Sequence, residues 1–242
     1  MVDCDNCKNS GTHCNECEHY WDLENYYSPM TAAEIAEKEE KVKQDIFLSI
    51  PSDLIAVELA EATIEAFKVA KEYTRVDPGK YNWLPSVYFG VNCLVATDQY
   101  RLIEIKEVEV PEHLVGSHIL EIDAQRGIAR VMREPGPNPL SSGSYKEVID
   151  ESTFTKVSTC VNQVKEVFEP SDEKGPGGEE LVVYTVEGIE IYIRKDWNEL
   201  ALSHFKNEVE FWYKEKHNPI AFTDNKITVI ILPVRISEPI RY

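Results

Sequence analysis

The sequence has no long apolar run. Nowhere does it approach the roughly eighteen consecutive apolar residues of a membrane-spanning helix. Residues 1–20 are polar and rich in cysteine, unlike the basic and apolar start of a secretory signal peptide. With 43% hydrophobic residues the chain can still bury a sizeable core. We therefore expect a soluble, globular, cytoplasmic protein.

Basic residues are scarce. The 25 lysines and arginines are outnumbered by 43 aspartates and glutamates, which gives a net charge of −18. Such a chain can contact nucleic acid only through a local basic patch, although a ring that is acidic outside could carry basic groups along its inner wall. Lys68, Lys71 and Arg75, at the end of an expected helix, are the one candidate DNA-binding patch. Glutamates interleave with them, so a solvated face is the competing interpretation.

Catalytic motifs are missing as well. There is no glycine-rich phosphate loop, no Gly-x-Ser-x-Gly elbow and no His-Glu-x-x-His motif. The six histidines are scattered along the chain. We therefore expect that the protein is not an enzyme.

Cysteines, in contrast, are concentrated near the start of the chain. Four of the six form two chelating pairs, Cys4-x2-Cys7 and Cys14-x2-Cys17. A two-residue spacer lets both thiolates of a pair reach one tetrahedral zinc ion. Four protein ligands leave no open coordination position, so the pattern predicts a structural zinc site. The short loop between the pairs is typical of a zinc knuckle.

The predicted zinc-binding segment covers residues 1–27, where His13 and His19 are alternative ligands in place of one cysteine. A charged connector helix is expected over residues 28–45. Thr31 and Glu34 have the spacing of a capping box, and the helix carries few large apolar side chains. It is therefore expected to be solvated.

From residue 46 onward the pattern changes to alternating strands and helices, with a Pro/Gly-rich loop at 134–143 as the predicted boundary between two lobes, 46–143 and 144–242. The first lobe is predicted to contain a strand at 46–50, a helix at 53–74, and strands at 87–89, 93–97, 102–110, 119–122 and 128–132. The second is predicted to contain a helix at 152–168, a disordered stretch at 169–180, strands at 181–186 and 189–193, a helix at 196–206, and strands at 209–213, 220–222 and 226–234.

These elements repeat. A strand, an acid-capped helix and antiparallel strands occur once from residue 46 and again from residue 189. The fold class that this order predicts is α+β, with antiparallel sheets and helices on one face.

Two short segments suggest a family. Residues 93–102, CLVATDQYRL, resemble the Val-Ala-Thr-Asp-Gly-His/Tyr-Arg-Leu run of the bacterial DNA polymerase sliding clamp. Residues 226–236, KITVIILPVRI, resemble the closing strand of the same family, which ends in Met/Leu-Pro-Met/Val-Arg-Leu. Residues 83–89 and 144–149 give supporting matches. Together the segments resemble the middle and last of the three clamp domains, with the first domain absent.

The resemblance implies a pocket that accepts short peptides from polymerases and repair proteins. Carried over position by position, its lining would be Leu84, Thr97, Tyr100, Arg101, Leu102, Val148, Ile230, Leu232, Pro233, Val234, Arg235 and Ile236. Three positions depart from the family pattern: Gln99 replaces a glycine, Gly143 a proline and Glu147 an arginine. The pocket shape and rim charge are therefore expected to differ.

Two functional hypotheses follow. The first is a clamp-like accessory protein of replication or repair, of phage or mobile-element origin, that binds peptide motifs and encircles DNA as a homo-oligomer. The second is a zinc-containing adaptor or regulatory protein whose clamp-like body does not form a ring. The oligomeric state would distinguish them.

Overall fold

A computed structural model describes residues 31–75, 83–135, 140, 154–186 and 188–235. The chain divides after Ser49 into two compact units. Only one helix of the first unit is described, so the predicted zinc segment 1–27 lies outside the described residues. Within the described part, no helix is long and apolar enough to cross a membrane.

The helix of the first unit, α1 (Ala32–Ser49), begins with the predicted capping box. The backbone N–H of Thr31 donates to Glu34 Oε2 at 2.8 Å, and the backbone N–H of Glu34 donates to Thr31 Oγ1 at 3.3 Å. The strand predicted at 46–50 is wrong, because residues 46–49 continue this helix. Pro51 disfavours helical backbone in the residue before it, which explains why the helix ends here.

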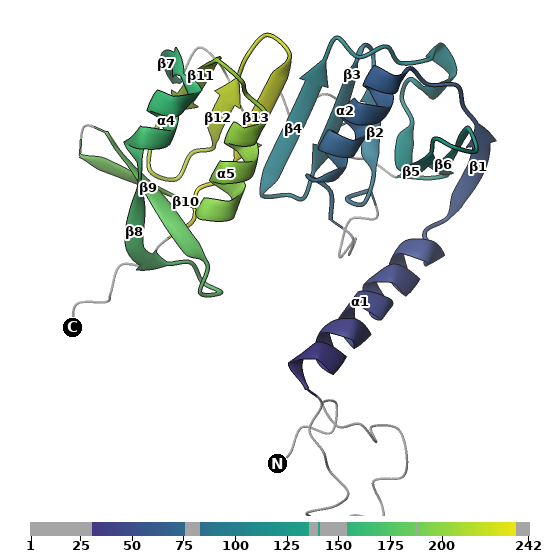
Figure 1. The fold of residues 1–242 in the computed structure, drawn as a ribbon, viewed down its shortest axis with the longest axis horizontal. Helices are drawn as coiled ribbons and strands as arrows, with labels where there is room; N and C mark the ends of the chain where they lie inside the picture. The colour runs from purple at the N-terminus through teal and green to yellow at the C-terminus, as the bar shows by residue number, and fades with distance from the viewer. Residues whose placement is uncertain (1–30, 76–82, 136–139, 141–153, 187, 236–242) are drawn as a thin grey trace, which may run out of the picture. The chain divides into compact units, whose positions relative to one another are not determined.

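The second unit is built around a ten-stranded sheet in which every neighbouring pair is antiparallel (Figure 1). Its strands, in spatial order, are β1 (Ser52–Ala56), β6 (Ile128–Met132), β5 (His118–Asp123), β2 (Val87–Gly90), β3 (Cys93–Thr97), β4 (Arg101–Lys106), β13 (Ile227–Ile231), β12 (Ile220–Thr223), β11 (Glu208–Tyr213) and β7 (Thr155–Cys160). A second, three-stranded antiparallel sheet has the order β10 (Ile189–Arg194), β9 (Glu180–Val186) and β8 (Phe168–Lys174). A short 3-10 helix, η4 (Glu112–Leu114), lies between β4 and β5 in the chain.

The helices of this unit pack on the core faces of the sheets. The α-helices of this unit whose bounds lie within the described residues are α2 (Glu61–Lys71), α4 (Val161–Val167) and α5 (Lys195–Ser203). Helix α2 packs against β2, β3 and β4, and α5 packs against β9 and β10 (Figure 1). One continuous core joins these elements, from Phe67 of α2 to Phe222 of β12. The architecture is mostly antiparallel sheet with a few helices, as the predicted fold class requires.

Strand alternation also creates a second, smaller apolar cluster. Successive side chains of a strand point to opposite faces, so residues next to core positions face away from the main core. Trp212, Ala221 and Ile230 form this cluster, with Leu102 and Phe154 packed against it. We call these five residues the second cluster.

The predicted repeat is present, but its first strand is residues 52–56 and not 46–50 as predicted. The order β1-α2-β2-β3-β4 recurs as β10-α5-β11-β12-β13. The two three-stranded groups meet where β4 pairs with β13. Elements β1 to β6 with α2 are called the N-terminal half below, and elements β7 to β13 with α4 and α5 the C-terminal half. The lobe boundary predicted between residues 143 and 144 lies outside the described residues.

The long helix predicted at 53–74 begins too early, since residues 52–56 form β1. Strand β1 pairs along its whole length with β6. Arg133 of the neighbouring chain segment pairs with Asp53 at 2.6 Å, and Arg130 Nε donates to Ser52 Oγ at 2.7 Å. The partner strand is distant in sequence, so helical periodicity in this segment gives no warning of the pairing.

The helix predicted at 152–168 and the disorder predicted at 169–180 are also wrong in part. Residues 155–160 form β7, which pairs with β11, and only residues 161–167 are helical. The acidic stretch that follows forms β8, anchored by Phe168. The Phe168 ring contacts Tyr184, Phe211 and Phe222 at centroid distances of 5.4, 5.5 and 6.0 Å. This aromatic anchor offsets the polar composition of the strand.

Candidate functional site

The two segments that suggested a family lie side by side. In the β4–β13 pair, Leu102 is opposite Ile230 and Arg101 is opposite Ile231. Beyond the pair, the backbone N–H of Leu232 donates to the carbonyl of Tyr100 at 2.9 Å. The predicted adjacency of these segments is therefore confirmed.

The turn between β3 and β4 is built by two polar side chains. The Asp98 carboxylate accepts the backbone N–H groups of Tyr100 and Arg101 at 2.9 and 2.7 Å. Thr97 Oγ1 donates to the carbonyl of Arg101 at 2.6 Å and accepts the N–H of Gln99. Gln99 has a φ of 82°, a left-handed conformation that glycine adopts without steric cost. The turn thus keeps a glycine-like backbone without a glycine.

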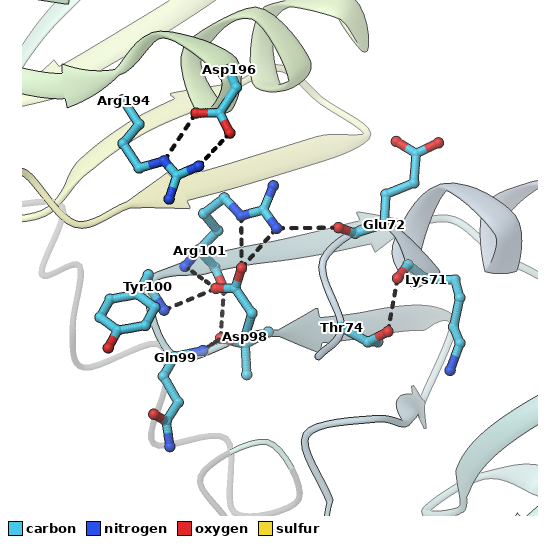
Figure 2. Close-up of polar contacts among 10 residues, drawn as sticks. Lys71, Glu72, Thr74, Asp98, Gln99, Tyr100, Arg101, Arg194 and Asp196 are labelled. Carbon is cyan, nitrogen blue, oxygen red and sulfur yellow. Dashed lines mark hydrogen bonds and ion pairs between the residues drawn. The ribbon is translucent and has the colours of Figure 1, made fainter. Parts of the chain in front are cut away.

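The Arg101 side chain points into the structure and is only 13% exposed (Figure 2). Its Nε donates to Asp98 Oδ2 at 2.8 Å, and its terminal Nη2 donates to the carbonyl of Glu72 at 3.3 Å. The guanidinium carbon lies 5.2 Å from the Tyr73 ring centre and 5.5 Å from the Trp197 ring centre. Arg101 therefore connects the end of α2, the β3–β4 turn and α5.

Tyr100 takes the exposed position on this turn. Its side chain is 51% exposed, and its ring stacks on Trp197 with centroids 5.9 Å apart and planes at 25°. Arg194 lies over the same Trp197 ring at 4.6 Å. It is held by Asp196 at 2.7 Å (Figure 2). The hydrogen bond to Asp196 raises the pKa of Arg194. Sequence reasoning missed Trp197 and Arg194 as site residues, because apolar spacing marks Trp197 only as a core position of its helix.

The closing segment after β13 runs between this turn and β10. Leu232, Pro233 and Val234 are partly buried, and Arg235 is exposed. The backbone N–H of Val234 donates to the carbonyl of Tyr192 at 2.8 Å. The segment is thus held by the β3–β4 turn on one side and by the second sheet on the other.

The geometry can be compared with solved structures. The sliding clamp (DNA polymerase III subunit beta) of Bartonella birtlesii bound to griselimycin matches with a TM-score of 0.51 and 14% identity, covering 77% of this chain and 66% of that one. The Pseudomonas aeruginosa sliding clamp with ligand gives a TM-score of 0.51, 14% identity, and coverage of 77% and 66%. The Caulobacter crescentus pol III beta gives 0.50, 15%, and coverage of 76% and 67%.

The protein has a clamp-like fold. It spans just under two thirds of the length of the first of these clamps. No family model matches the sequence, and no curated protein matches it. At this identity the likeness concerns the fold alone.

Not every predicted lining residue of the clamp-like fold is accessible. Leu84 is 1% exposed and Thr97 is 8% exposed, so both side chains are buried and cannot contact a ligand. Leu102 and Ile230 belong to the second cluster. Val148 and Ile236 lie outside the described residues. Among the described residues, the exposed or partly exposed lining consists of Tyr100, Arg101, Leu102 and the closing segment 232–235.

The three residues of the predicted DNA patch differ in exposure. Lys68 is exposed and pairs with Glu65 at 2.6 Å. Lys71 instead donates its ammonium hydrogens to the carbonyls of Pro85 and Leu120, and burial lowers its pKa to about 8. Arg75 is partly buried. Of the three cations, only Lys68 is exposed.

Two side chains with buried polar atoms lie at the ends of α2 and α5, near Arg101. The rings of Tyr73 and His204 lie 5.7 Å apart, and within the described residues neither Tyr73 Oη nor His204 Nε2 has a hydrogen-bond partner. Burial raises the pKa of Tyr73 and lowers the pKa of His204, so both side chains stay neutral at physiological pH.

Proposed function

We propose that this protein is a non-catalytic, clamp-like accessory protein that binds short peptide motifs of replication or repair proteins beside the β4–β13 junction. The observation that carries the proposal is the hydrogen bond from Leu232 to Tyr100, which continues the β4–β13 pairing into the closing segment. The clamp-like fold supports it. The clamp of Bartonella birtlesii, which has a similar fold, was solved bound to griselimycin.

The chemistry of the junction suits an apolar peptide. Tyr100, Leu232, Pro233 and Val234 present apolar surface that is only partly covered. Burying apolar surface on binding contributes about 25 cal/mol per Å², and a few well-packed side chains usually dominate such interfaces. A peptide with one or two large apolar anchors is therefore the expected ligand.

The test is a binding titration with a fluorescent peptide that carries Leu and Phe anchors, against the same peptide with both anchors replaced by Ala. We expect saturable binding of the first peptide only. Tyr100→Ala and Leu232→Ala should each weaken it by about tenfold or more. Val91→Ala is the matched control, because Val91 is 74% exposed on the β2–β3 turn. Absence of binding, or equal binding of both peptides, would refute the proposal.

Ring formation around DNA is the second part of the proposal. Among the described residues, β1 and β7 each have a neighbour on one side only. Because the sheet has ten antiparallel strands, its two edge strands run in opposite directions. Copies joined head to tail would therefore continue the sheet as an antiparallel pair of β7 and β1, and such heterologous contacts close into a ring when the rotation between copies completes a full turn.

Native mass spectrometry and small-angle scattering test this part. We expect a closed oligomer that Leu54→Pro converts to a monomer, since Leu54 is 70% exposed on β1 and proline there removes a backbone donor. A monomeric wild-type protein that still binds the peptide would favour the adaptor hypothesis. Salt-dependent DNA retention by the oligomer would show electrostatic contact with the phosphates, and encirclement would further require that retention on circular DNA is lost when the DNA is linearised.

The zinc site remains a proposal from sequence. Two Cys-x2-Cys pairs supply four thiolates, which suit zinc at a closed tetrahedral site. Metal analysis of protein never exposed to chelator should find one zinc per chain, and Cys4→Ser with Cys7→Ser should abolish it. Less than half an equivalent in the wild-type protein would contradict the proposal.

A further inference from the structure

Arg101 lies between the two halves of the clamp-like unit. The guanidinium carbon lies 5.2 Å from the ring centre of Tyr73, which follows α2 in the N-terminal half. It lies 5.5 Å from the ring centre of Trp197 of α5, in the C-terminal half. A guanidinium is planar and can pack against two aromatic rings at once. The side chain therefore bridges the halves through contacts with one ring from each half.

The hydrogen-bonding groups of Arg101 are largely used inside the protein. Nε and Nη2 both contact Asp98 Oδ2, at 2.8 and 2.7 Å, and Nη2 also donates to the Glu72 carbonyl (Figure 2). The other Asp98 oxygen holds the backbone of Tyr100 and Arg101. With 13% of the Arg101 side chain and 12% of Asp98 exposed, this ion pair offers little surface to a ligand.

We propose that Asp98 and Arg101 form a lock that joins the two halves and holds Tyr100 against Trp197. Arg101 is thus a positioning residue for the peptide site and does not touch the peptide itself. The inference rests on the proposed function as far as the peptide is concerned, whereas the lock exists in the free protein. Tyr100, with half of its side chain exposed, is the ligand contact that the lock presents.

Arg194 provides a matched control. It lies over the same Trp197 ring at 4.6 Å, and both this ring and its polar partners, Asp196 and Glu179, belong to its own half. The polar partners of Arg101, Asp98 and Glu72, likewise belong to the half of Arg101, but Arg101 also reaches the Trp197 ring of the other half. Lysine keeps the charge of arginine but loses the planar fork. Arg101→Lys should therefore loosen the contact between the β3–β4 turn and α5, whereas Arg194→Lys should perturb only the surface of α5.

The first experiment uses the free full-length protein and needs no peptide. Amide hydrogen exchange is measured for the end of α2, the β3–β4 turn and α5 in the wild type, Arg101→Lys, Asp98→Asn and Arg194→Lys. We expect the first two variants to speed exchange by about tenfold in all three segments together. Arg194→Lys should affect α5 only. Unchanged exchange in Arg101→Lys, or the same three-segment response in Arg194→Lys, would overturn the lock.

The second experiment asks whether Arg101 touches the ligand. The anchored peptide is prepared with acidic, neutral and basic flanks, and its affinity is measured for the wild type and Arg101→Lys. A positioning role predicts the same fold-loss for all three peptides, and no further loss when Arg101→Lys is added to Trp197→Leu. A loss confined to the acidic peptide would show direct contact and refute the positioning role. If the wild type binds no peptide, the proposed function fails, while hydrogen exchange still decides the lock.

Discussion

Acidification should destabilise this protein through one buried histidine. His118 on β5 is 1% exposed, its Nδ1 lies 2.9 Å from Ser86 Oγ, and its ring packs against Tyr88 at 5.1 Å. Burial lowers the pKa of His118 from 6.5 to about 4. The folded protein therefore holds this imidazole neutral at pH values where the unfolded chain binds a proton.

The sign and size of the effect follow from this difference. As the pH falls, the unfolded chain binds the His118 proton at a higher pH than the folded protein does. The free energy of unfolding is therefore unaffected by this group above pH 6.5 and decreases as the pH falls toward 4. The gap between the two pKa values corresponds to roughly 3 kcal/mol in total. About 2 kcal/mol of it should be lost between neutral pH and about pH 4.5.

The assay is urea unfolding at neutral pH and at about pH 4.5, for the wild type and His118→Gln. Other groups titrate over the same range, so the quantity to compare is the pH-induced loss in each protein. Between the two pH values, the free energy of unfolding of the variant should fall by about 2 kcal/mol less than that of the wild type. His217→Gln, at an exposed position, is the control and should lose as much as the wild type. Equal losses in all three proteins would refute the reasoning.

Three further predictions concern stability. Burial lowers the Lys71 pKa from 10.5 to about 8, so the unfolded chain holds more protons than the folded protein between these pH values. The free energy of unfolding should therefore rise with pH over this range by up to roughly 3 kcal/mol. In urea titrations the variant Lys71→Met should lack this rise. Phe168→Ala should lower the free energy of unfolding by about 3 to 4 kcal/mol, because Phe168 is buried. Glu169→Ala, at an exposed position, should change it by no more than about 0.5 kcal/mol. If both variants unfold at the same temperature, β8 is not packed on the core. Gln99→Gly should raise the unfolding free energy by up to about 1 kcal/mol because its φ is 82°, and a destabilised variant would contradict strain at this turn.

Strands joined by short turns could be predicted from sequence. The β2–β3 and β3–β4 turns and the strands from 208 to 231 occur close to their expected places, because alternation and turn residues are local signals. Helix α5 was also predicted within a few residues. The adjacency of β4 and β13, in contrast, was expected only from the resemblance of two short segments.

Elements that depend on distant partners could not be predicted in the same way. Residues 52–56 become a strand because β6 and its arginines are available, and residues 155–160 because β11 is available. Apolar spacing of three and four residues favoured helices in both places. The pairing free energy comes from segments far along the chain, so no local pattern reports it.

Local patterns in the sequence predict the α+β class and the repeated strand-helix-strand order, and the resemblance of two short segments predicts that they meet at the junction. Which side chains at that junction face solvent depends on how the elements pack. This packing turned Arg101 inward and left Tyr100 exposed, brought Trp197 onto Tyr100, and committed Lys71 to two buried carbonyls. The physical reason is that periodicity assigns a residue to a face of its own element, whereas exposure and hydrogen-bond partners depend on what other elements pack against that face.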